Sequence, residues 1–179
     1  MGKLQACVLG ATGMVGQHFI RILENHPTIE VSVVTASEKS QSKNYGNATD
    51  WIVSNTIPES VGHLKVTRTK SDEILKQNLD LVFSALPSSA AFDIESELAQ
   101  GGLPVFSNTG AHRMDDDVPI LIPEINPSHL ELTKEQNYGD GFIVTNSNCS
   151  TSGLVFGLKP LQEFGIKSVV VSTYQAVSD

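Results

Sequence analysis

The feature that most constrains the fold of this chain is a glycine-rich turn that follows a short apolar run. Gly10, Gly13 and Gly16 are spaced Gly-x-x-Gly-x-x-Gly between a predicted strand at residues 5–9 and a predicted helix at residues 13–25. Such glycines permit a tight turn, let the backbone approach a pyrophosphate, and bring the phosphate to the N–H groups of the helix N-terminus. The alternative is a glycine-rich turn without a ligand. We predict a dinucleotide site, with cofactor contacts from Gly10, Thr12, Gly13, Met14 and Val15.

Apolar runs and helical patterns alternate along the first part of the chain. The runs lack strict polar alternation, which is typical of strands buried on both faces of a parallel sheet. This order predicts an α/β fold, a Rossmann-like parallel sheet with helices on both faces. Residues 36–55 are predicted to form a loop with one short helix near Trp51. The predicted strands are residues 5–9, 29–35, 64–66, 79–86 and 103–106, and the predicted helices are residues 13–25, 71–77 and 88–100.

The composition of the chain changes after residue 106. Residues 107–140 are rich in Asn, Asp, Pro and Gly, and we expect them to cross between two domains. A strand at 142–145, a helix at 150–164 and a strand at 167–177 are predicted to follow. That last strand would expose apolar residues without a partner. We therefore expect a nucleotide-binding domain over residues 1–140, the truncated start of an α+β catalytic and dimerisation domain over residues 141–179, and a natural protein that continues beyond this chain.

Residues that follow the second predicted strand bear on the choice between NAD and NADP. NAD sites usually place an acidic residue at the end of this strand, where it holds the ribose 2′-hydroxyl. Here the strand end carries no acid, and Ser37, Lys39, Ser40 and Lys43 can donate to a 2′-phosphate. Glu38 weakens this preference, and such lysines are also common in solvated loops. The pattern favours NADP over NAD.

Cys149 lies between an apolar predicted strand and a predicted helix, in the sequence Thr-Asn-Ser-Asn-Cys-Ser-Thr-Ser-Gly. The positive end of a helix dipole stabilises a thiolate, and the neighbouring polar groups can donate to an oxyanion. The alternative is a small buried hydrophobe, which is the interpretation we give to Cys7 among Ala and Val. A thiolate beside a dinucleotide would add to an aldehyde. Hydride would then leave that carbon to the nicotinamide, and a thioester would remain.

The composition excludes several other classes of function. Twelve Lys and Arg against twenty Asp and Glu give a net charge of −8, which disfavours a nucleic-acid partner. Two distant cysteines form neither a disulfide framework nor a metal-ligand cluster, so no metal is expected. No apolar run approaches the ~18 residues needed to cross a membrane. We expect a cytoplasmic protein with no membrane partner.

These residues together resemble the aspartate-semialdehyde dehydrogenases, particularly their archaeal and fungal branch. The resemblance depends chiefly on the glycine-rich turn at residues 10–17 and on the block around Cys149 at residues 146–151. It runs essentially from end to end of the chain. Further blocks agree with it at residues 36–40, 84–87, 107–114, 118–126 and 172–178.

The resemblance implies an NADP-dependent enzyme that interconverts L-aspartate 4-semialdehyde plus phosphate with 4-aspartyl phosphate. This reaction belongs to lysine, threonine and methionine biosynthesis, and the full-length family member is expected to be a homo-oligomer. By resemblance, Cys149 is the nucleophile, Arg113 binds phosphate, and Asn148 and Gln175 position the substrate. The other implied contacts are Ala85 and Leu86 at the cofactor and Asn108 at the substrate.

The sequence departs from the family in two respects, and two alternatives stay open. Ser147 stands where the family usually has proline, and none of the five histidines matches the family's general base. We interpret all five as structural or solvated, so the 179-residue chain alone is expected to be inactive. One alternative is a malonyl-CoA reductase, in which coenzyme A replaces phosphate. The other is a non-catalytic NADP-binding fragment that needs a second chain.

Overall fold

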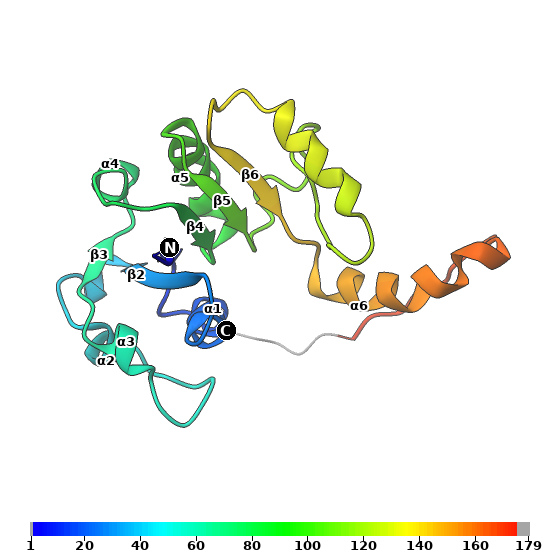
Figure 1. The fold of residues 1–179 in the computed structure, drawn as a ribbon. Coiled ribbons are helices and arrows are strands. Elements are labelled where there is room, and N and C mark those ends of the chain that lie inside the picture. The colour runs from blue at the N-terminus through cyan, green and yellow to red at the C-terminus, as the bar shows by residue number, and fades with distance from the viewer. Residues whose placement is uncertain (1, 175–179) are drawn as a thin grey trace.

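A six-stranded parallel sheet forms the centre of the protein in a computed structural model that describes residues 2–174 (Figure 1). The strand order is β3-β2-β1-β4-β5-β6, and every neighbouring pair is parallel. This confirms the predicted Rossmann-like class, because the same strand order characterises dinucleotide-binding folds. The strands are β1 (Leu4–Leu9), β2 (Ile29–Ala36), β3 (Val66–Arg68), β4 (Leu81–Ser84), β5 (Pro104–Ser107) and β6 (Phe142–Thr145).

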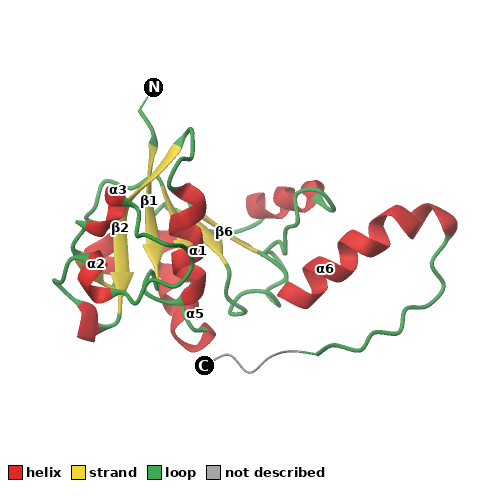
Figure 2. Cartoon of the chain, turned by 90° about the horizontal axis from the view of Figure 1, so that it is seen from below, coloured by secondary structure: helices red, strands yellow, loops and turns green. Residues whose placement is uncertain are grey.

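Helices cover both faces of the sheet, as the alternating pattern predicts (Figure 2). Within β1, Cys7 and Leu9 pack in a core with α4 and α5, whereas Val8 packs in a second core with α1, α2 and α3. Successive strand residues point to opposite faces, so the apolar, buried run Ala6–Leu9 of β1 serves both cores. The helices are α1 (Met14–Leu23), α2 (Tyr45–Ala48), α3 (Glu59–Gly62), α4 (Ser71–Ile74), α5 (Ser88–Gln100) and α6 (Cys149–Leu158), with 3-10 turns at Glu38–Ser40, Pro127–Lys134 and Lys159–Phe164.

The structure corrects two expectations about the middle of the chain. The short helix predicted near Trp51 lies earlier, at α2, and β3 begins at Val66 rather than at residue 64. Residues 107–140 do not lead out of the sheet, because they connect β5 to its parallel neighbour β6. β6 thus belongs to the same sheet as β1 to β5.

The strand predicted at residues 167–177 is not formed in its described part. Residues 167–174 are exposed and have no regular secondary structure, and the remainder lies outside the described residues. A strand needs a hydrogen-bonded neighbour, and the described residues offer this segment none. α6 and the turn after it extend away from the sheet (Figure 1).

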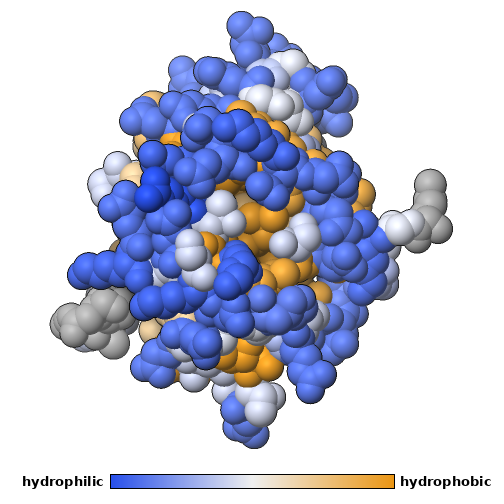
Figure 3. All heavy atoms as spheres, turned by 90° about the vertical axis from the view of Figure 1, so that its left-hand side faces the viewer, coloured by the Kyte–Doolittle hydropathy of each residue, from blue (hydrophilic) through white to orange (hydrophobic). Residues whose placement is uncertain are grey.

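The surface of the protein is mainly hydrophilic on the face drawn in Figure 3, with apolar side chains in a hollow near its centre. Larger apolar side chains are exposed beyond the sheet, including Phe156 and Phe164. Over residues 2–174, no helix is both long enough and apolar enough to span a membrane.

The two isoleucines of α1 provide a matched test of the core. Ile20 is 1% exposed and packs against the sheet, whereas Ile22 is 65% exposed. We expect Ile20→Ala to lower the free energy of unfolding by about 2–5 kcal/mol. Ile22→Ala should change it by less than about 0.5 kcal/mol, because the side chain is already exposed. The same substitution in the same helix changes helix propensity equally, so the difference between the two variants reports burial. Urea unfolding measures both values, and equal losses would contradict this packing.

Candidate functional site

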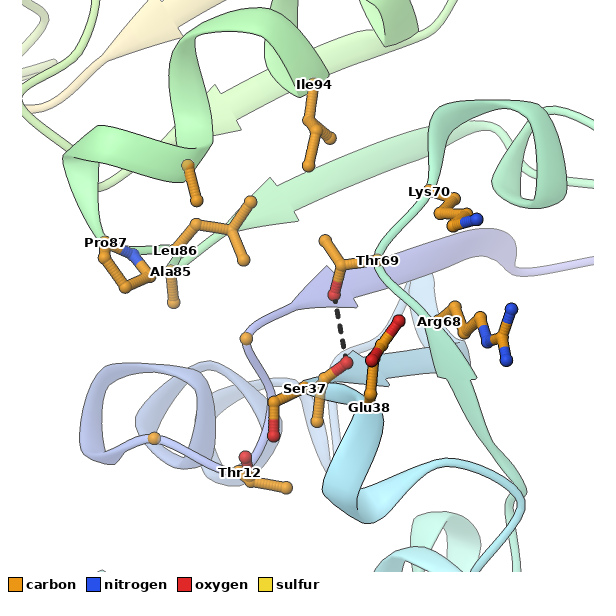
Figure 4. A pocket seen from close by; sticks show the side chains of 14 residues that line it. Thr12, Ser37, Glu38, Arg68, Thr69, Lys70, Ala85, Leu86, Pro87 and Ile94 are labelled. Atoms are coloured by element: carbon orange, nitrogen blue, oxygen red, sulfur yellow. Dashed lines mark hydrogen bonds between the residues drawn. The ribbon is translucent and has the colours of Figure 1, made fainter.

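A pocket of about 630 Å³ opens at the carboxyl ends of the first four strands. Ligands of doubly wound sheets bind at this edge, where the connections diverge to opposite faces. One wall is apolar and the other carries charged and hydroxyl groups (Figure 4). The lining residues are Gly10, Thr12 and Gly13 after β1, Ala36, Ser37 and Glu38 at the end of β2, Arg68, Thr69 and Lys70 at the end of β3, Ala85, Leu86 and Pro87 after β4, and Ala90 and Ile94 of α5.

The glycines of the turn permit contacts that a side chain would block. Gly10 has a φ of +68°, and a Cβ there would lie 2.6 Å from the carbonyl oxygen of Ala85. A Cβ on Gly16 would lie 2.3 Å from the carbonyl oxygen of Gly10, so α1 can approach β1 closely only because this residue is glycine. Gly13 has room for a Cβ, with its nearest neighbour at 3.5 Å. The first and third glycines thus shape the turn, and the second leaves its backbone open to a ligand.

Two buried polar side chains hold the glycine-rich turn in place. The Tyr45 hydroxyl donates to the Ala11 carbonyl at 2.7 Å, and burial raises the pKa of Tyr45 to about 12, which keeps this donor protonated. The Gln17 amide donates to the Thr12 carbonyl at 3.0 Å, and its oxygen accepts from the Ile52 backbone at 2.9 Å. The turn is therefore fixed before any ligand binds, which lowers the ordering cost of binding.

The structure brings six of the ten predicted cofactor residues to this pocket: Gly10, Thr12, Gly13, Ser37, Ala85 and Leu86. Met14 and Val15 are exposed on the first turn of α1, outside the lining. Lys39 and Ser40 lie in the 3-10 turn next to Ser37 and do not line the pocket either.

The segment Arg68–Lys70 was not predicted from the sequence; it lies beside Ser37 and Glu38 on the polar wall, across the pocket from Ala85, Leu86 and Pro87 (Figure 4). The Thr69 hydroxyl lies 2.9 Å from that of Thr35 and 3.2 Å from the Ala36 carbonyl, which fixes this segment against the end of β2. The error follows from ending the third strand at residue 66. Arg68 and Lys70, which alternate with threonines directly after Val66, are the signal that could have identified it.

A second polar cluster lies at the ends of β5 and β6, and it contains two of the predicted substrate residues. Arg113 Nε donates to the Asn146 carbonyl at 2.9 Å, and one terminal nitrogen donates to the Asn108 carbonyl at 3.3 Å. The side chains of Asn108 and Asn146 are also hydrogen-bonded to each other. Arg113 is thereby held at Asn146, which precedes Cys149 by three residues. The two segments follow the neighbouring strands β5 and β6.

Cys149 is the first residue of α6, as expected, and it is exposed. Asn148 is the N-cap, and its side-chain oxygen accepts from the Ser150 backbone at 3.0 Å. Ser147, where the family has proline, is buried, and its hydroxyl lies 2.6 Å from that of Ser152. Cys7 is fully buried in the sheet, and burial raises the pKa of its thiol. Gln175 lies outside the described residues.

Comparison with known proteins agrees with this arrangement. The family model described as semialdehyde dehydrogenase, NAD binding domain, matches residues 5–133.

The chain belongs to the semialdehyde dehydrogenase family.

Relatives within and near this family match almost the whole chain. An aspartate-semialdehyde dehydrogenase of Archaeoglobus fulgidus is 45% identical over 174 residues, which are 96% of this chain and 50% of that protein. A malonyl-CoA reductase (NADP) of Metallosphaera sedula is 38% identical over 98% of this chain and 49% of that protein. A crystal structure of aspartate-semialdehyde dehydrogenase with NADP from Candida albicans superposes with a TM-score of 0.80 at 39% identity, covering 89% of this chain and 47% of that one. The chain thus spans about half the length of the curated relatives it matches.

The glycine-rich turn can be tested with two alanine substitutions three residues apart. Gly16→Ala forces its Cβ against the Gly10 carbonyl, so we expect the free energy of unfolding to fall by about 1–3 kcal/mol. Gly13→Ala brings its Cβ only to ordinary van der Waals contact with the Gly10 carbonyl and should cost less than about 1 kcal/mol. Denaturant unfolding distinguishes them, and equal costs would show that helix α1 does not depend on this close approach.

The exposure of the two thiols predicts selective alkylation of the folded chain. Cys149 is exposed, whereas Cys7 is buried with a raised pKa, so iodoacetamide should modify Cys149 alone. Peptide mass spectrometry locates the modified residue, and alkylation in denaturant, which should reach both thiols, is the control. Native modification of Cys7, or protection of Cys149, would contradict the assigned positions.

Proposed function

We propose that this chain carries the cofactor site and the nucleophile of an NADP-dependent aspartate-semialdehyde dehydrogenase. In this reaction L-aspartate 4-semialdehyde is oxidised to 4-aspartyl phosphate, and biosynthesis uses the reverse direction. One observation carries the proposal. The glycine-rich pocket follows β1 to β4, and Cys149 follows β6, so the parallel sheet presents both along one edge. The similarity to aspartate-semialdehyde dehydrogenases supports this substrate.

The pocket residues fit NADP. The turn from Gly10 to Gly13 offers backbone to a pyrophosphate, and the apolar wall at Ala85 and Leu86 suits the planar rings. Ser37, Lys39 and Ser40 remain our proposed contacts to the 2′-phosphate, and Arg68 and Lys70 add cationic groups on the same polar wall, at the end of the neighbouring strand β3. When bound, the nicotinamide accepts the hydride that leaves the substrate carbon. Met14 and Val15 are proposed to contribute through the helix N-terminus.

Residues of this chain would carry out thioester formation, phosphate binding and substrate positioning. The Cys149 thiolate adds to the aldehyde carbon, the hydride on that carbon leaves, and a thioester remains. Phosphate attacks the thioester carbonyl, which releases 4-aspartyl phosphate and restores the thiolate. We assign phosphate binding to Arg113, and substrate positioning to Asn108, Asn148 and Gln175.

The remaining roles are assigned to the whole protein. We propose that residues up to Thr145 form the nucleotide-binding unit and that the residues after it begin a catalytic and dimerisation domain. The general base is assigned to a part of the protein outside this chain, and the full-length protein is proposed to be a cytoplasmic homo-oligomer in lysine, threonine and methionine biosynthesis.

The similarity to malonyl-CoA reductase favours one alternative, in which coenzyme A takes the place of phosphate at the same thioester. In that case Arg113 would not bind phosphate.

Cofactor preference gives the first test. NADP should raise the melting temperature of the chain more than NAD at equal concentration, because the 2′-phosphate adds ionic contacts. Lys39→Gln and Arg68→Gln should each reduce this difference, and Lys134→Gln, on an exposed 3-10 turn, is the control. Equal shifts with the two dinucleotides would remove the role assigned to Ser37, Lys39 and Ser40.

Adduct formation gives the second test. Incubation with L-aspartate 4-semialdehyde and NADP should leave a 4-aspartyl thioester on Cys149 with an equivalent of reduced nicotinamide, visible by intact mass and absorbance. Added phosphate should discharge the adduct, and Cys149→Ser should form none. We expect little steady turnover without the base. A malonyl thioester on Cys149 that forms from malonyl-CoA with release of coenzyme A, and that reduced NADP discharges as the semialdehyde, would instead favour the alternative enzyme.

A further inference from the structure

Helix α5 holds the loop that carries Arg113 and Asn108. We call residues 107–113 the Arg113 loop. Three residues on one face of α5, spaced four and three apart, contact it. The Ser88 hydroxyl oxygen accepts from the Gly110 backbone at 3.1 Å, the Phe92 carbonyl lies 3.1 Å from His112 Nε2, and a Glu95 oxygen accepts from the Ser107 hydroxyl at 2.9 Å. Successive turns of one helix face therefore each contact a different residue of the loop.

The centre of this contact is a buried polar cluster. Glu95 and His112 are 0% and 1% exposed, and His112 Nε2 lies 3.8 Å from Glu95 Oε2. One Glu95 oxygen, Oε2, is buried without a hydrogen-bond partner in the part of the chain that the structure describes, as is the nearby Ser84 hydroxyl. Burial raises the pKa of Glu95. A core of apolar side chains of similar volume would avoid these desolvation costs, so packing alone does not account for the cluster.

Hydrogen bonds pass from the cluster into the loop backbone. The Ser107 hydroxyl oxygen accepts from the Thr109 backbone at 3.1 Å, and the Thr109 hydroxyl oxygen accepts from the Ala111 backbone at 3.2 Å. His112 Nδ1 lies 2.7 Å from a carboxylate oxygen of Asp115, and its ring stacks on Phe92 with centroids 4.5 Å apart. Both ring nitrogens of His112, the residue before Arg113, therefore lie within hydrogen-bond distance of an oxygen.

We propose that Glu95 and His112 are positioning residues, which fix the Arg113 loop so that Arg113 and Asn108 face the substrate phosphate. The phosphate part of this statement rests on the function proposed above for Arg113. Neither residue contacts Arg113 through its side chain in the described hydrogen bonds, so both act through the loop backbone. Loss of the Glu95 acceptor should free Ser107 and Thr109, and the Arg113 side chain should then lose its fixed place at Asn146.

The experiment measures water exchange of the arginine Nε–H protons by NMR on the whole nitrogen-labelled chain. The Arg113 Nε–H donates to Asn146, and the Arg68 Nε–H donates to a Gln41 oxygen at 2.6 Å, beside β3 at the opposite edge of the sheet. Glu95→Met keeps the volume but removes the acceptor, and should accelerate exchange at Arg113 about tenfold while leaving Arg68 unchanged. Glu95→Gln retains an acceptor for Ser107 and should restore slow exchange at Arg113. His112→Phe keeps the stacking on Phe92 without its hydrogen bonds, and is the second test should Glu95→Met fail to fold.

Two outcomes would overturn the proposal. Unchanged exchange at Arg113 in Glu95→Met or His112→Phe would show that the loop does not need these residues. Equal acceleration at Arg68 would show that they support only the global fold. Titration of the same samples with inorganic phosphate separates this inference from the proposed function. If phosphate leaves the wild-type Arg113 signal unmoved, the phosphate role of Arg113 fails, whereas the exchange comparison still decides whether Glu95 and His112 position it.

Discussion

The arrangement of this protein depends on the parallel pairing of its six strands. Because all strands run in one direction, the segments that follow them emerge along one edge of the sheet. Residues as distant in sequence as Gly10, Arg68 and Cys149 therefore follow strands of the same edge. The sheet can be buried on both faces because successive apolar residues of its central strands point to opposite sides, and β1 shows this most clearly, with Cys7 and Val8 in different cores.

The close approach of α1 to β1 determines the cofactor end of this edge. Gly16 has no side chain to separate them. Tyr45 and Gln17 then hold the turn by hydrogen bonds to the Ala11 and Thr12 carbonyls. At the other end, α5 holds the Arg113 loop through a buried polar cluster. The same helix contributes Ile94 to the pocket and Glu95 to the cluster, so adjacent residues of α5 support the two halves of the site.

Local patterns were enough to predict the fold class, most strands, and the turn at Gly10. They also placed Cys149 at a helix start, because an apolar strand, a polar turn and an apolar helix follow one another there. The patterns failed where structure depends on distant partners. The apolar run at 167–177 was predicted as a strand, yet its described part has no neighbour to pair with. The place of β6 in the sheet could not be read from residues 107–140, since only the pairing with β5 decides it. Arg68 was missed by an error of two residues in one short strand, and Glu95 because nothing local distinguishes it from other helix glutamates.

The central claim is that one edge of the sheet presents the dinucleotide and the thiol to a common substrate. A crystal structure of the chain with NADP bound tests it most directly. The account predicts that the glycine-rich turn binds the pyrophosphate, that the 2′-phosphate lies between the ends of β2 and β3, and that the nicotinamide points along the edge toward Cys149. A nicotinamide that points toward β3, with the adenosine on the side of Cys149, would contradict it.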